Sequence, residues 1–392
     1  MTFERQMEDE ELAELIDQEI ANMSGGELHL KDRLRLQKEL FDSFRRLDIL
    51  QELVEDPEIT EIMVNGPGDI FIESEGKMRR WDKTFESREQ LLDLIQQIVS
   101  SVNRIVNTST PIADARLADG SRVHVVLEPV ALDGPVLTIR KFPEPVTMER
   151  LLAYGSISEE AAGLLKTLVM ARYNIFVSGG TGAGKTTFLN ALSEYIPAQE
   201  RVITIEDSAE LRLQHIENLV RMETRDANAE GQGAIGIGEL IRAALRMHPT
   251  RILIGEVRGR EALDLLQAMN TGHDGSFSTG HGNSPRDMLS RLETMVLMAA
   301  DLPLPAIRSQ IASAIDVMVH VARLRDSSRK VTAIEEVDRY ENGEIVLNPL
   351  YRFQESGLAD GKTALAGKVE GELMRTGELR HKEKLRLAGL EL

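Results

Sequence analysis

Residues 173–187 read Tyr-Asn-Ile-Phe-Val-Ser-Gly-Gly-Thr-Gly-Ala-Gly-Lys-Thr-Thr, an apolar strand that runs directly into a glycine-rich loop. A helix-forming segment, 188–192, follows the loop. Glycines let backbone N–H groups turn inward around an anion, and the start of a helix adds the positive end of its dipole. The order of strand, loop and helix is that of a phosphate-binding loop, and it predicts a parallel, helix-covered sheet.

The loop matches the pattern G-x-x-x-x-G-K-[ST], so its residue types have predicted roles. We expect the Lys185 ammonium to reach the β- and γ-phosphates of ATP, and the Thr186 hydroxyl to join the shell of an Mg²⁺ ion. A glycine-rich turn that binds no nucleotide would not need lysine and threonine at its end. The residues predicted to bind nucleotide are Gly179, Gly180, Thr181, Gly182, Ala183, Gly184, Lys185, Thr186 and Thr187.

Composition limits the class of protein. The chain has 392 residues, 42% hydrophobic and 28% charged, as in soluble proteins of two or three domains. No run approaches the roughly 18 apolar residues of a membrane span and no secretory signal is evident, so we expect a cytoplasmic protein. The absence of cysteine excludes disulfides and thiolate zinc sites. The formal charge of −18 argues against nucleic acid as a direct partner, because phosphate backbones attract basic surfaces.

Hydrophobic periodicity divides the first part of the chain into two segments. Residues 1–54 place apolar side chains at helical spacing and predict an N-terminal helical segment, which forms a small bundle or an assembly arm. Residues 55–141 predict an α+β domain, with a helix that begins after Ser87 and ends near Val102. Its strands are expected at 61–65, 69–73, 77–81, 122–126 and 136–140.

The second part of the chain has a different pattern. Residues 142–150 contain two prolines near their start and predict a semi-rigid linker. Residues 151–353 alternate helices with buried strands and predict an α/β domain. Its expected elements include a helix at 158–171 and strands at 201–205 and 251–255. Residues 354–392 form a charged C-terminal tail.

Two strands that follow the loop end in carboxylates. Glu256 comes directly after one strand, and Glu206 and Asp207 end another. The carboxyl ends of parallel strands meet at the edge that holds the phosphate loop. We expect Glu256 to hold Mg²⁺ through water or to orient the attacking water, and Glu206 to accept the proton of that water. The alternative for both Glu256 and Glu206 is that each is an ordinary acidic residue at the end of a strand, without a catalytic role.

Residues 270–281 form a loop of small residues that contains two of the eight histidines, His273 and His281. We expect His281 to contact the γ-phosphate and His273 to support the loop. The two histidines lie eight residues apart with no third ligand nearby, so they do not form a zinc site.

Three arginines, Arg116, Arg122 and Arg140, lie on the strand-rich domain, outside the nucleotide-binding part of the chain. Surface arginines are usually solvated or ion-paired. A domain hinged beside the phosphate loop can nonetheless supply an arginine that stabilises charge in the transition state.

The motifs of the second part occur in a characteristic order. They are Gly-Gly-Thr-Gly-Ala-Gly-Lys-Thr-Thr at 179–187, Thr-Ile-Glu-Asp at 204–207, Gly-Glu-Val-Arg-Gly at 255–259 and Gly-His-Asp-Gly-Ser-Phe-Ser-Thr-Gly-His at 272–281. This set resembles the motor ATPases of type II and type IV secretion and of pili. The stretches at 61–66, 114–122 and 132–142 look most like the CpaF/TadA branch, which serves Flp-type (tight adherence) pili. The resemblance spans residues 47–353.

The resemblance implies a RecA-like P-loop ATPase domain, preceded by a PAS-like α+β domain and assembled as a homo-hexamer. It makes residues 179–187 the Walker A motif, Glu256 the Walker B acid, Glu206 the Asp-box acid and His281 the His-box histidine. The implied cofactors are ATP and Mg²⁺, and Thr186 and Glu256 would hold the metal.

The resemblance also implies contacts between domains and subunits. Arg122 and Arg140 match the N-terminal arginines that complete the nucleotide pocket, and Arg242 and Arg246 are weaker matches to residues that cross the subunit boundary. The chain departs from the family at Thr250, where an acid is common, and in Gly282, where alanine is common. It also lacks the tetracysteine zinc element of many type II secretion and pilus-extension motors.

The implied function is an ATP hydrolase whose turnover closes the domains of a ring at the inner face of the membrane. That motion would act on inner-membrane platform proteins and power the assembly of a Flp-type pilus, with its retraction as a possible second activity. One alternative is a conjugation, type IV or type II secretion motor that exports protein or DNA. A second alternative is a nucleic-acid translocase, which the acidic net charge disfavours. A third is a non-catalytic scaffold, which the full set of charged groups in the site disfavours.

Overall fold

The computed structural model describes residues 8–24, 28–74, 77–102, 104–141, 145–225, 232–356 and 369–392. The chain folds into two compact units, Met1–Glu144 and Pro145–Leu392. Each unit has its own hydrophobic core. Residues 142–144, at the start of the predicted linker, lie outside the described residues, as does the 357–368 part of the predicted tail.

The first unit begins with a helical hairpin, α1 (Asp9–Ser24) and α2 (Leu30–Arg45). Ion pairs join the two helices: Arg33 with Asp17 at 2.6 Å, and Arg45 with Asp9 at 3.3 Å. A single 3₁₀ turn, η1 (Asp48–Leu50), and the short α3 (Gln51–Glu55) lead into the sheet. The predicted helical character of this segment is confirmed.

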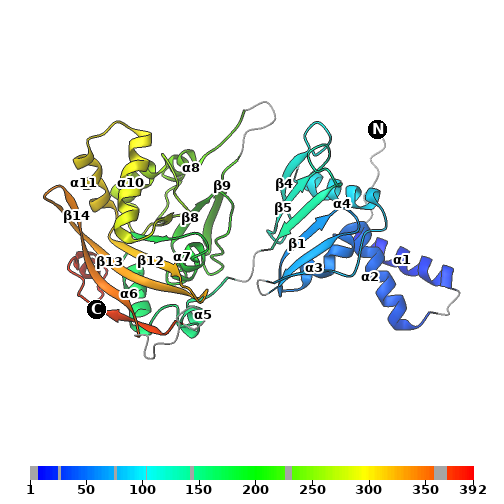
Figure 1. The fold of residues 1–392 in the computed structure, drawn as a ribbon, viewed down its shortest axis with the longest axis horizontal. Coiled ribbons are helices and arrows are strands. Elements are labelled where there is room, and N and C mark those ends of the chain that lie inside the picture. The colour runs from blue at the N-terminus through cyan, green and yellow to red at the C-terminus, as the bar shows by residue number, and fades with distance from the viewer. Residues whose placement is uncertain are drawn as a thin grey trace. The chain divides into compact units, whose positions relative to one another are not determined.

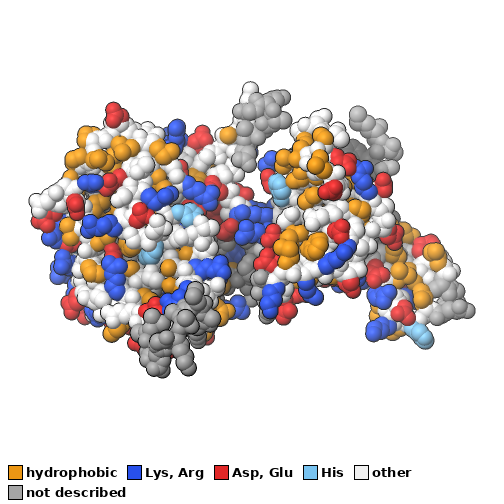
Figure 2. Space-filling model, viewed as in Figure 1, with side chains coloured by type: hydrophobic (Ala, Val, Ile, Leu, Met, Phe, Trp, Pro, Cys, Tyr) orange, Lys and Arg blue, Asp and Glu red, His pale blue; other side chains and the backbone are white. Residues whose placement is uncertain are grey.

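The hairpin leaves one apolar side uncovered. Ile16 and Ile20 are buried, but hydrophobic side chains remain at the surface of the hairpin (Figure 2). They form a groove of ≈ 900 Å³, lined by Leu12, Leu15, Ile16, Glu19, Ile20, Met23, Leu28, Leu36, Leu40 and Phe44. None of the described helices, those of the hairpin included, combines the length and apolar character needed to cross a bilayer.

One antiparallel sheet forms the centre of the first unit, in the order β3-β2-β1-β6-β5-β4 (Figure 1). Its strands are β1 (Ile59–Asn65), β2 (Ile70–Ser74), β3 (Lys77–Arg80), β4 (Ile112–Arg116), β5 (Arg122–Val126) and β6 (Val136–Arg140). Helix α4 (Arg88–Ser101) shares the hydrophobic core with the sheet. Ser87 caps this helix as predicted, since its Oγ accepts a hydrogen bond from the Gln90 N–H at 3.1 Å. The α+β prediction is confirmed, and β4 is the strand that it missed.

The second unit is built on a larger sheet. Its order, within the described residues, is β15-β14-β13-β12-β7-β11-β10-β8-β9. The strands are β7 (Ile175–Gly179), β8 (Arg201–Glu206), β9 (Asn218–Glu223), β10 (Arg251–Ile254), β11 (Phe277–His281), β12 (Val317–Arg323), β13 (Arg329–Glu341), β14 (Glu344–Glu355) and β15 (Gly371–Arg375). The strands from β12 to β9 pair in parallel, which confirms the predicted sheet. An antiparallel extension, β13-β14-β15, adds to it.

Helices cover both faces of this sheet (Figure 1). They are α5 (Met148–Ala153), α6 (Glu159–Met170), α7 (Lys185–Ser193), α8 (Ile237–Ala244), α9 (Ala262–Asn270), α10 (Pro285–Ala299), α11 (Leu304–Ala314) and α12 (Glu383–Leu387). Alternate residues of β7 enter opposite cores: Ile175 and Val177 pack with α6 and α7, whereas Phe176 packs with α9 and α10. This alternation is the one that a central strand with two covered faces requires. The predicted α/β fold class is therefore confirmed.

The last residues of the chain pack onto the second unit. The prediction of a charged tail at 354–392 is incomplete, because β15 and α12 lie within that range and bury Leu373 and Leu385 in the core. The Tyr173 hydroxyl donates to the His381 carbonyl oxygen at 2.6 Å. Lys384 Nζ lies 2.7 Å from carboxylate oxygens of both Asp274 and Asp316. These contacts attach the C-terminal segment to the start of β7 and β12.

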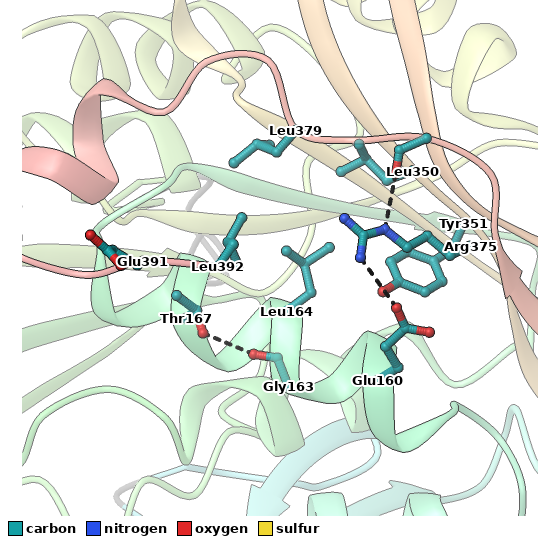
Figure 3. A pocket seen from close by; sticks show the side chains of 11 residues that line it. Glu160, Gly163, Leu164, Thr167, Leu350, Tyr351, Arg375, Leu379, Glu391 and Leu392 are labelled. Atoms are coloured by element: carbon teal, nitrogen blue, oxygen red, sulfur yellow. Dashed lines mark hydrogen bonds and ion pairs between the residues drawn. The ribbon is translucent and has the colours of Figure 1, made fainter.

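A cavity of ≈ 300 Å³ lies between α6 and the C-terminal segment (Figure 3). Its lining includes Leu164 and Leu379, and the Arg375 guanidinium faces Glu160 there at 3.5 Å. No residue of the phosphate-binding loop lines this cavity. The cavity is thus separate from the predicted site.

Candidate functional site

The phosphate-binding loop joins β7 to α7. Gly179, at the end of β7, packs so closely that a Cβ there would lie 2.3 Å from the Val321 carbonyl oxygen. Gly182 and Gly184 have positive φ angles of 71° and 89°, which side chains with a Cβ rarely adopt. Gly184 is also the N-cap of α7, so the loop ends at the positive end of a helix. The local geometry is that of an anion-binding loop.

Adjacent parallel strands bring the predicted groups to one edge of the sheet. In the order β7-β11-β10-β8, the strands end at Gly179, His281, Ile254 and Glu206. Gly179 and His281 pair directly. Glu256 follows the end of β10 by two residues. The edge that carries the loop therefore also carries the acids and the histidine.

Lys185, His281 and Glu256 form a chain of polar contacts at this edge. Lys185 Nζ donates to the Gly180 carbonyl oxygen at 3.3 Å and lies 3.2 Å from His281 Nδ1. His281 Nε2 lies 2.8 Å from Glu256 Oε1. A neutral imidazole with its proton on Nε2 suits both neighbours, since Nδ1 can then accept a hydrogen bond from the ammonium. Three of the predicted catalytic residues thus lie together.

Burial controls the protonation of these groups. Lys185 is 8% exposed, and burial lowers the pKa of its ammonium, while the nearby Glu256 carboxylate raises it. Burial likewise lowers the pKa of His281, and Glu256 again acts in the opposite direction. A lowered histidine pKa favours the neutral imidazole at neutral pH. A phosphate bound beside Lys185 would favour the charged ammonium, because opposite charges stabilise each other most where water is excluded.

Arg258 holds the second oxygen of Glu256. Its Nη2 donates to Glu256 Oε2 at 2.9 Å, and its Nη1 lies 3.6 Å from Asp207 Oδ2. Arg258 therefore links the carboxylates that follow β8 and β10. In the sequence, Arg258 stands within the motif Gly-Glu-Val-Arg-Gly and has no predicted role of its own. Its place two residues after Glu256 is the signal that could have identified it.

The groups at the edge fit an Mg²⁺ ion bound through water and phosphate. Glu256 Oε1 is buried without a hydrogen bond, although His281 Nε2 lies 2.8 Å from it. A carboxylate oxygen left in this state can accept from a metal-bound water. Thr186, half-buried at the start of α7, offers its hydroxyl. Among the described residues, no cluster of three or more His, Cys, Asp or Glu side chains is suited to a metal.

The carboxylate of Glu206 contacts the backbone. Its Oε1 accepts hydrogen bonds from the N–H groups of Glu210 at 2.9 Å and Leu211 at 3.1 Å. The side chain is buried, and burial raises its pKa to about 7 although these hydrogen bonds oppose the shift. Gly255 leaves room for it, since a Cβ there would lie 3.0 Å from Glu206 Cγ. Glu206 is therefore partly protonated near neutral pH, and its role as proton acceptor stays a prediction.

We expect Glu206 to make the protein less stable as the pH rises from about 4.5 to about 7. Its folded-state pKa of about 7 exceeds the unfolded value of 4.5, so the folded state keeps a proton that the unfolded state releases. The stabilising contribution, roughly 3 kcal/mol, is complete below the unfolded pKa and is lost as the pH rises through the folded pKa. Glu206→Gln removes this titration.

Chemical denaturation near pH 4.5 and near pH 8 measures the effect. The unfolding free energy of Glu206→Gln should fall less between the two pH values than that of the wild type. The exposed Glu217→Gln is the matched control and should follow the wild type. An equal decrease in all three proteins would show that Glu206 does not titrate in this way.

The predicted N-terminal arginines form a row on the first unit. Arg122 pairs directly with Arg140 across β5 and β6, and with Arg116 across β5 and β4. Arg140 is exposed. The row belongs to the first unit and Lys185 to the second, so completion of the nucleotide pocket by these arginines stays a prediction.

The remaining candidates lie around the second unit. Arg242 forms an ion pair with Asp264 at 2.9 Å, and Arg246 is exposed in the turn after α8. The carbonyl oxygen of His273 accepts a hydrogen bond from Ser276 Oγ at 2.7 Å, within the loop that precedes β11. A Cβ at Gly282 would lie 3.0 Å from Met288 Cβ, so glycine relieves a close contact there.

Comparisons with known proteins identify the family of the chain. Residues 45–359 match the family of type II/IV secretion system proteins. The chain is similar to a Mycobacterium tuberculosis protein assigned provisionally to conjugal transfer, with 36% identity over 324 residues, 81% of this chain and 91% of that protein. It is also similar to the type IV secretion system protein VirB11 of Brucella suis, with 32% identity over 304 residues, 70% of this chain and 84% of that protein.

A solved structure shares the fold. The ATPase DotB of Legionella pneumophila aligns with a TM-score of 0.54 and 21% identity, over 74% of this chain and 80% of that one. The family match covers most of the chain and includes Lys185, His281 and Glu256. The chain therefore belongs to the type II/IV secretion system protein family and is an ATP hydrolase.

Proposed function

We propose that the chain is the ATP-driven motor of a conjugation or type IV secretion machine. The observation that supports its chemistry is the contact chain Lys185–His281–Glu256 beside the phosphate-binding loop. The assignments of these two relatives, to conjugal transfer and to type IV secretion, favour this class of machine. These relatives share about a third of their residues with the chain over most of its length.

The proposed mechanism gives each residue a distinct task. The loop binds the phosphates through its backbone N–H groups, and Lys185 offsets their negative charge. Glu256 orients the attacking water, and Glu206 is the second candidate to accept its proton. His281 contacts both Lys185 and Glu256, so a change in its position when the γ-phosphate binds would affect both residues. Thr186 and Glu256 would hold an Mg²⁺ ion, which would neutralise phosphate charge when bound.

We further propose that six copies form a ring in which the N-terminal unit moves with the nucleotide state. The row of Arg116, Arg122 and Arg140 supports this idea, since three adjacent cations on one sheet suit a phosphate better than a neutral surface does. The ring would act from the cytoplasm on inner-membrane platform proteins. Undiminished ATP turnover in Arg140→Ala would rule out a role for that arginine in hydrolysis.

A Flp-type pilus motor is the second candidate. The stretches at 61–66, 114–122 and 132–142 favour it, because they look most like the CpaF/TadA branch. The same site chemistry would serve either machine, so the site does not distinguish them. The difference lies in the cargo: exported protein or DNA in one case, and small pilin subunits in the other.

Replacement of the gene by a Lys185→Ala allele in the native host tests the choice. We expect export or conjugal transfer to be lost while pilin at the cell surface is unchanged. Lys166→Ala, an exposed lysine on α6, is the control and should support both activities. Loss of surface pilin with normal export would favour the pilus motor instead.

A nucleic-acid translocase is the alternative from another class. The formal charge of −18 opposes it, because DNA and RNA bind to basic surfaces. We expect the ATP turnover of the purified chain to be the same with and without DNA or RNA. A several-fold stimulation by either nucleic acid would favour the translocase.

A further inference from the structure

Arg329, at the start of β13, contacts the phosphate-binding loop. Its Nε donates a hydrogen bond to the Gly182 carbonyl oxygen at 2.9 Å. A Cβ on Gly184 would lie 3.2 Å from Arg329 Cδ, so the aliphatic part of the side chain packs against the loop. The residue is exposed overall, which places this contact at the surface of the site. Arg329, which is distant from the loop in the sequence, is thus in direct contact with it.

The order of the strands brings Arg329 to this position. β12 lies beside β7 and sets Val321 opposite Gly179. β13 then returns antiparallel to β12 and pairs Arg329 with Arg323. The start of β13 therefore lies near the end of β7, where the loop begins. The contact depends on this arrangement and not on any residue pattern within the loop.

Arg329 has no carboxylate partner among the residues that the structure describes. Its neighbours are engaged: Arg325 forms an ion pair with Glu355, and Arg323 donates to Ser327 Oγ at 3.1 Å. The Gly182 contact uses only Nε, so within the described ranges both Nη groups of Arg329 keep their hydrogen-bonding capacity. A planar guanidinium in this state matches the geometry of phosphate oxygens. Its position against an anion-binding loop points to an anionic ligand.

The position of the Arg329–Gly182 contact indicates which phosphates of a bound nucleotide Arg329 can reach. The backbone of such a loop cradles the α- and β-phosphates, whereas its lysine reaches the β- and γ-phosphates. Arg329 contacts the loop backbone at Gly182, while His281 and Glu256 lie on the side of Lys185. The α- and β-phosphates are common to ADP and ATP. A residue that binds them contributes to the affinity for both nucleotides.

We propose that Arg329 is a nucleotide-binding residue that contacts the α- or β-phosphate of ADP and ATP alike. The inference rests on the nucleotide site proposed above. It gives the second unit a phosphate-binding cation of its own, in addition to Lys185. It also links the β12–β13 hairpin to the bound nucleotide, because the guanidinium contacts the loop and the phosphates together.

Titration calorimetry of the full chain with ADP and with a non-hydrolysable ATP analogue tests the proposal. Arg329→Ala should weaken the binding of both ligands about tenfold or more, the usual effect of losing a charged hydrogen bond. Arg329→Lys keeps the charge but not the planar donor geometry, so it should recover only part of this affinity. In steady-state hydrolysis, Arg329→Ala should raise KM for ATP with little change in kcat, because the groups at the γ-phosphate are untouched.

Lys330→Ala is the matched control, since Lys330 is the next residue of β13 and its Nζ donates to the Gly155 carbonyl oxygen at 2.8 Å. It should bind both nucleotides as the wild type does. Unchanged ADP affinity in Arg329→Ala would overturn the proposal, and so would a loss confined to the ATP analogue.

Two further measurements separate loss of binding from loss of folding and from absence of the nucleotide site. Thermal unfolding without nucleotide checks that Arg329→Ala folds, and Arg329→Gln replaces it if it does not, with the same expected tenfold loss. Failure of the wild type to bind ADP would contradict the nucleotide site itself. Wild-type binding with unchanged binding by the Arg329 variants would contradict only the role of Arg329.

Discussion

Lys185→Ala is expected to lower ATP turnover at least about 100-fold, because it removes the cation nearest the β- and γ-phosphates from a site with little water. The lysine is 8% exposed, and its Nζ lies 3.2 Å from His281 Nδ1. Nucleotide binding should weaken as well, since bound phosphate and the Lys185 ammonium stabilise each other. Phosphate release measures turnover, and calorimetry measures affinity.

The control for this variant is Lys166→Ala, on the exposed side of α6. It changes the net charge equally and should leave turnover within about twofold of the wild type, as distant surface changes usually do. Lys185→Arg should not restore activity, since a planar guanidinium does not fit where a compact ammonium is needed. Turnover of Lys185→Ala close to that of the wild type would mean that hydrolysis takes place elsewhere.

Glu256→Gln is expected to lower kcat about 100-fold or more while ATP binding is kept, because the amide can neither accept a proton nor orient water as a carboxylate does. Glu256 Oε1 lies 2.8 Å from His281 Nε2, and its Oε2 accepts from Arg258. Removal of this negative charge also reduces repulsion of the phosphates. The affinity for ATP should therefore stay the same or increase, so that kcat falls without a rise in the dissociation constant.

The exposed Glu217→Gln is the matched control, because it makes the same chemical change on the surface of the same unit. It should affect neither kcat nor affinity. A Glu256→Gln variant that keeps a third or more of the wild-type kcat would assign the essential carboxylate to another residue, and Glu206 would be the first to test. Loss of ATP binding in this variant would indicate a structural role for Glu256.

Much of the site could be predicted because its parts follow from local pattern and strand direction. The loop of Gly179 to Thr187 has a residue pattern that fixes its own geometry. Glu256 and His281 follow buried strands, and parallel strands of one sheet end at one edge. The sequence therefore predicted their proximity to Lys185 without any knowledge of the strand order. This prediction required only two short strand-like patterns and one glycine-rich loop.

The antiparallel extension of the second sheet could not be predicted, because its buried residues include charged ones. Glu335 and Glu336 of β13 are almost fully buried. Glu335 pairs with Arg352 of β14, and Glu336 accepts hydrogen bonds from the backbone N–H groups of Arg380 and His381. These partners lie 17 to 45 residues away in the sequence, so the residue pattern of the strand resembles that of a polar segment. Satisfied carboxylates of this kind break the alternation by which strands are recognised.

The contacts of individual side chains could not be predicted from the sequence either. Arg329 reaches the phosphate-binding loop only through the pairing of β7, β12 and β13. Glu206 was predicted from its place at a strand end, but its hydrogen bonds to Glu210 and Leu211 depend on the path of the following loop. Such contacts follow from tertiary structure, which residue patterns do not encode locally.

Steady-state phosphate release by the purified full chain, with ATP in the presence of Mg²⁺ or of a chelator, measures whether ATP is hydrolysed at the site of Lys185, His281 and Glu256. The wild type should release phosphate only with Mg²⁺, and Glu256→Gln should bind ATP without releasing phosphate above background. Equal phosphate release by the wild type and Glu256→Gln would contradict the account.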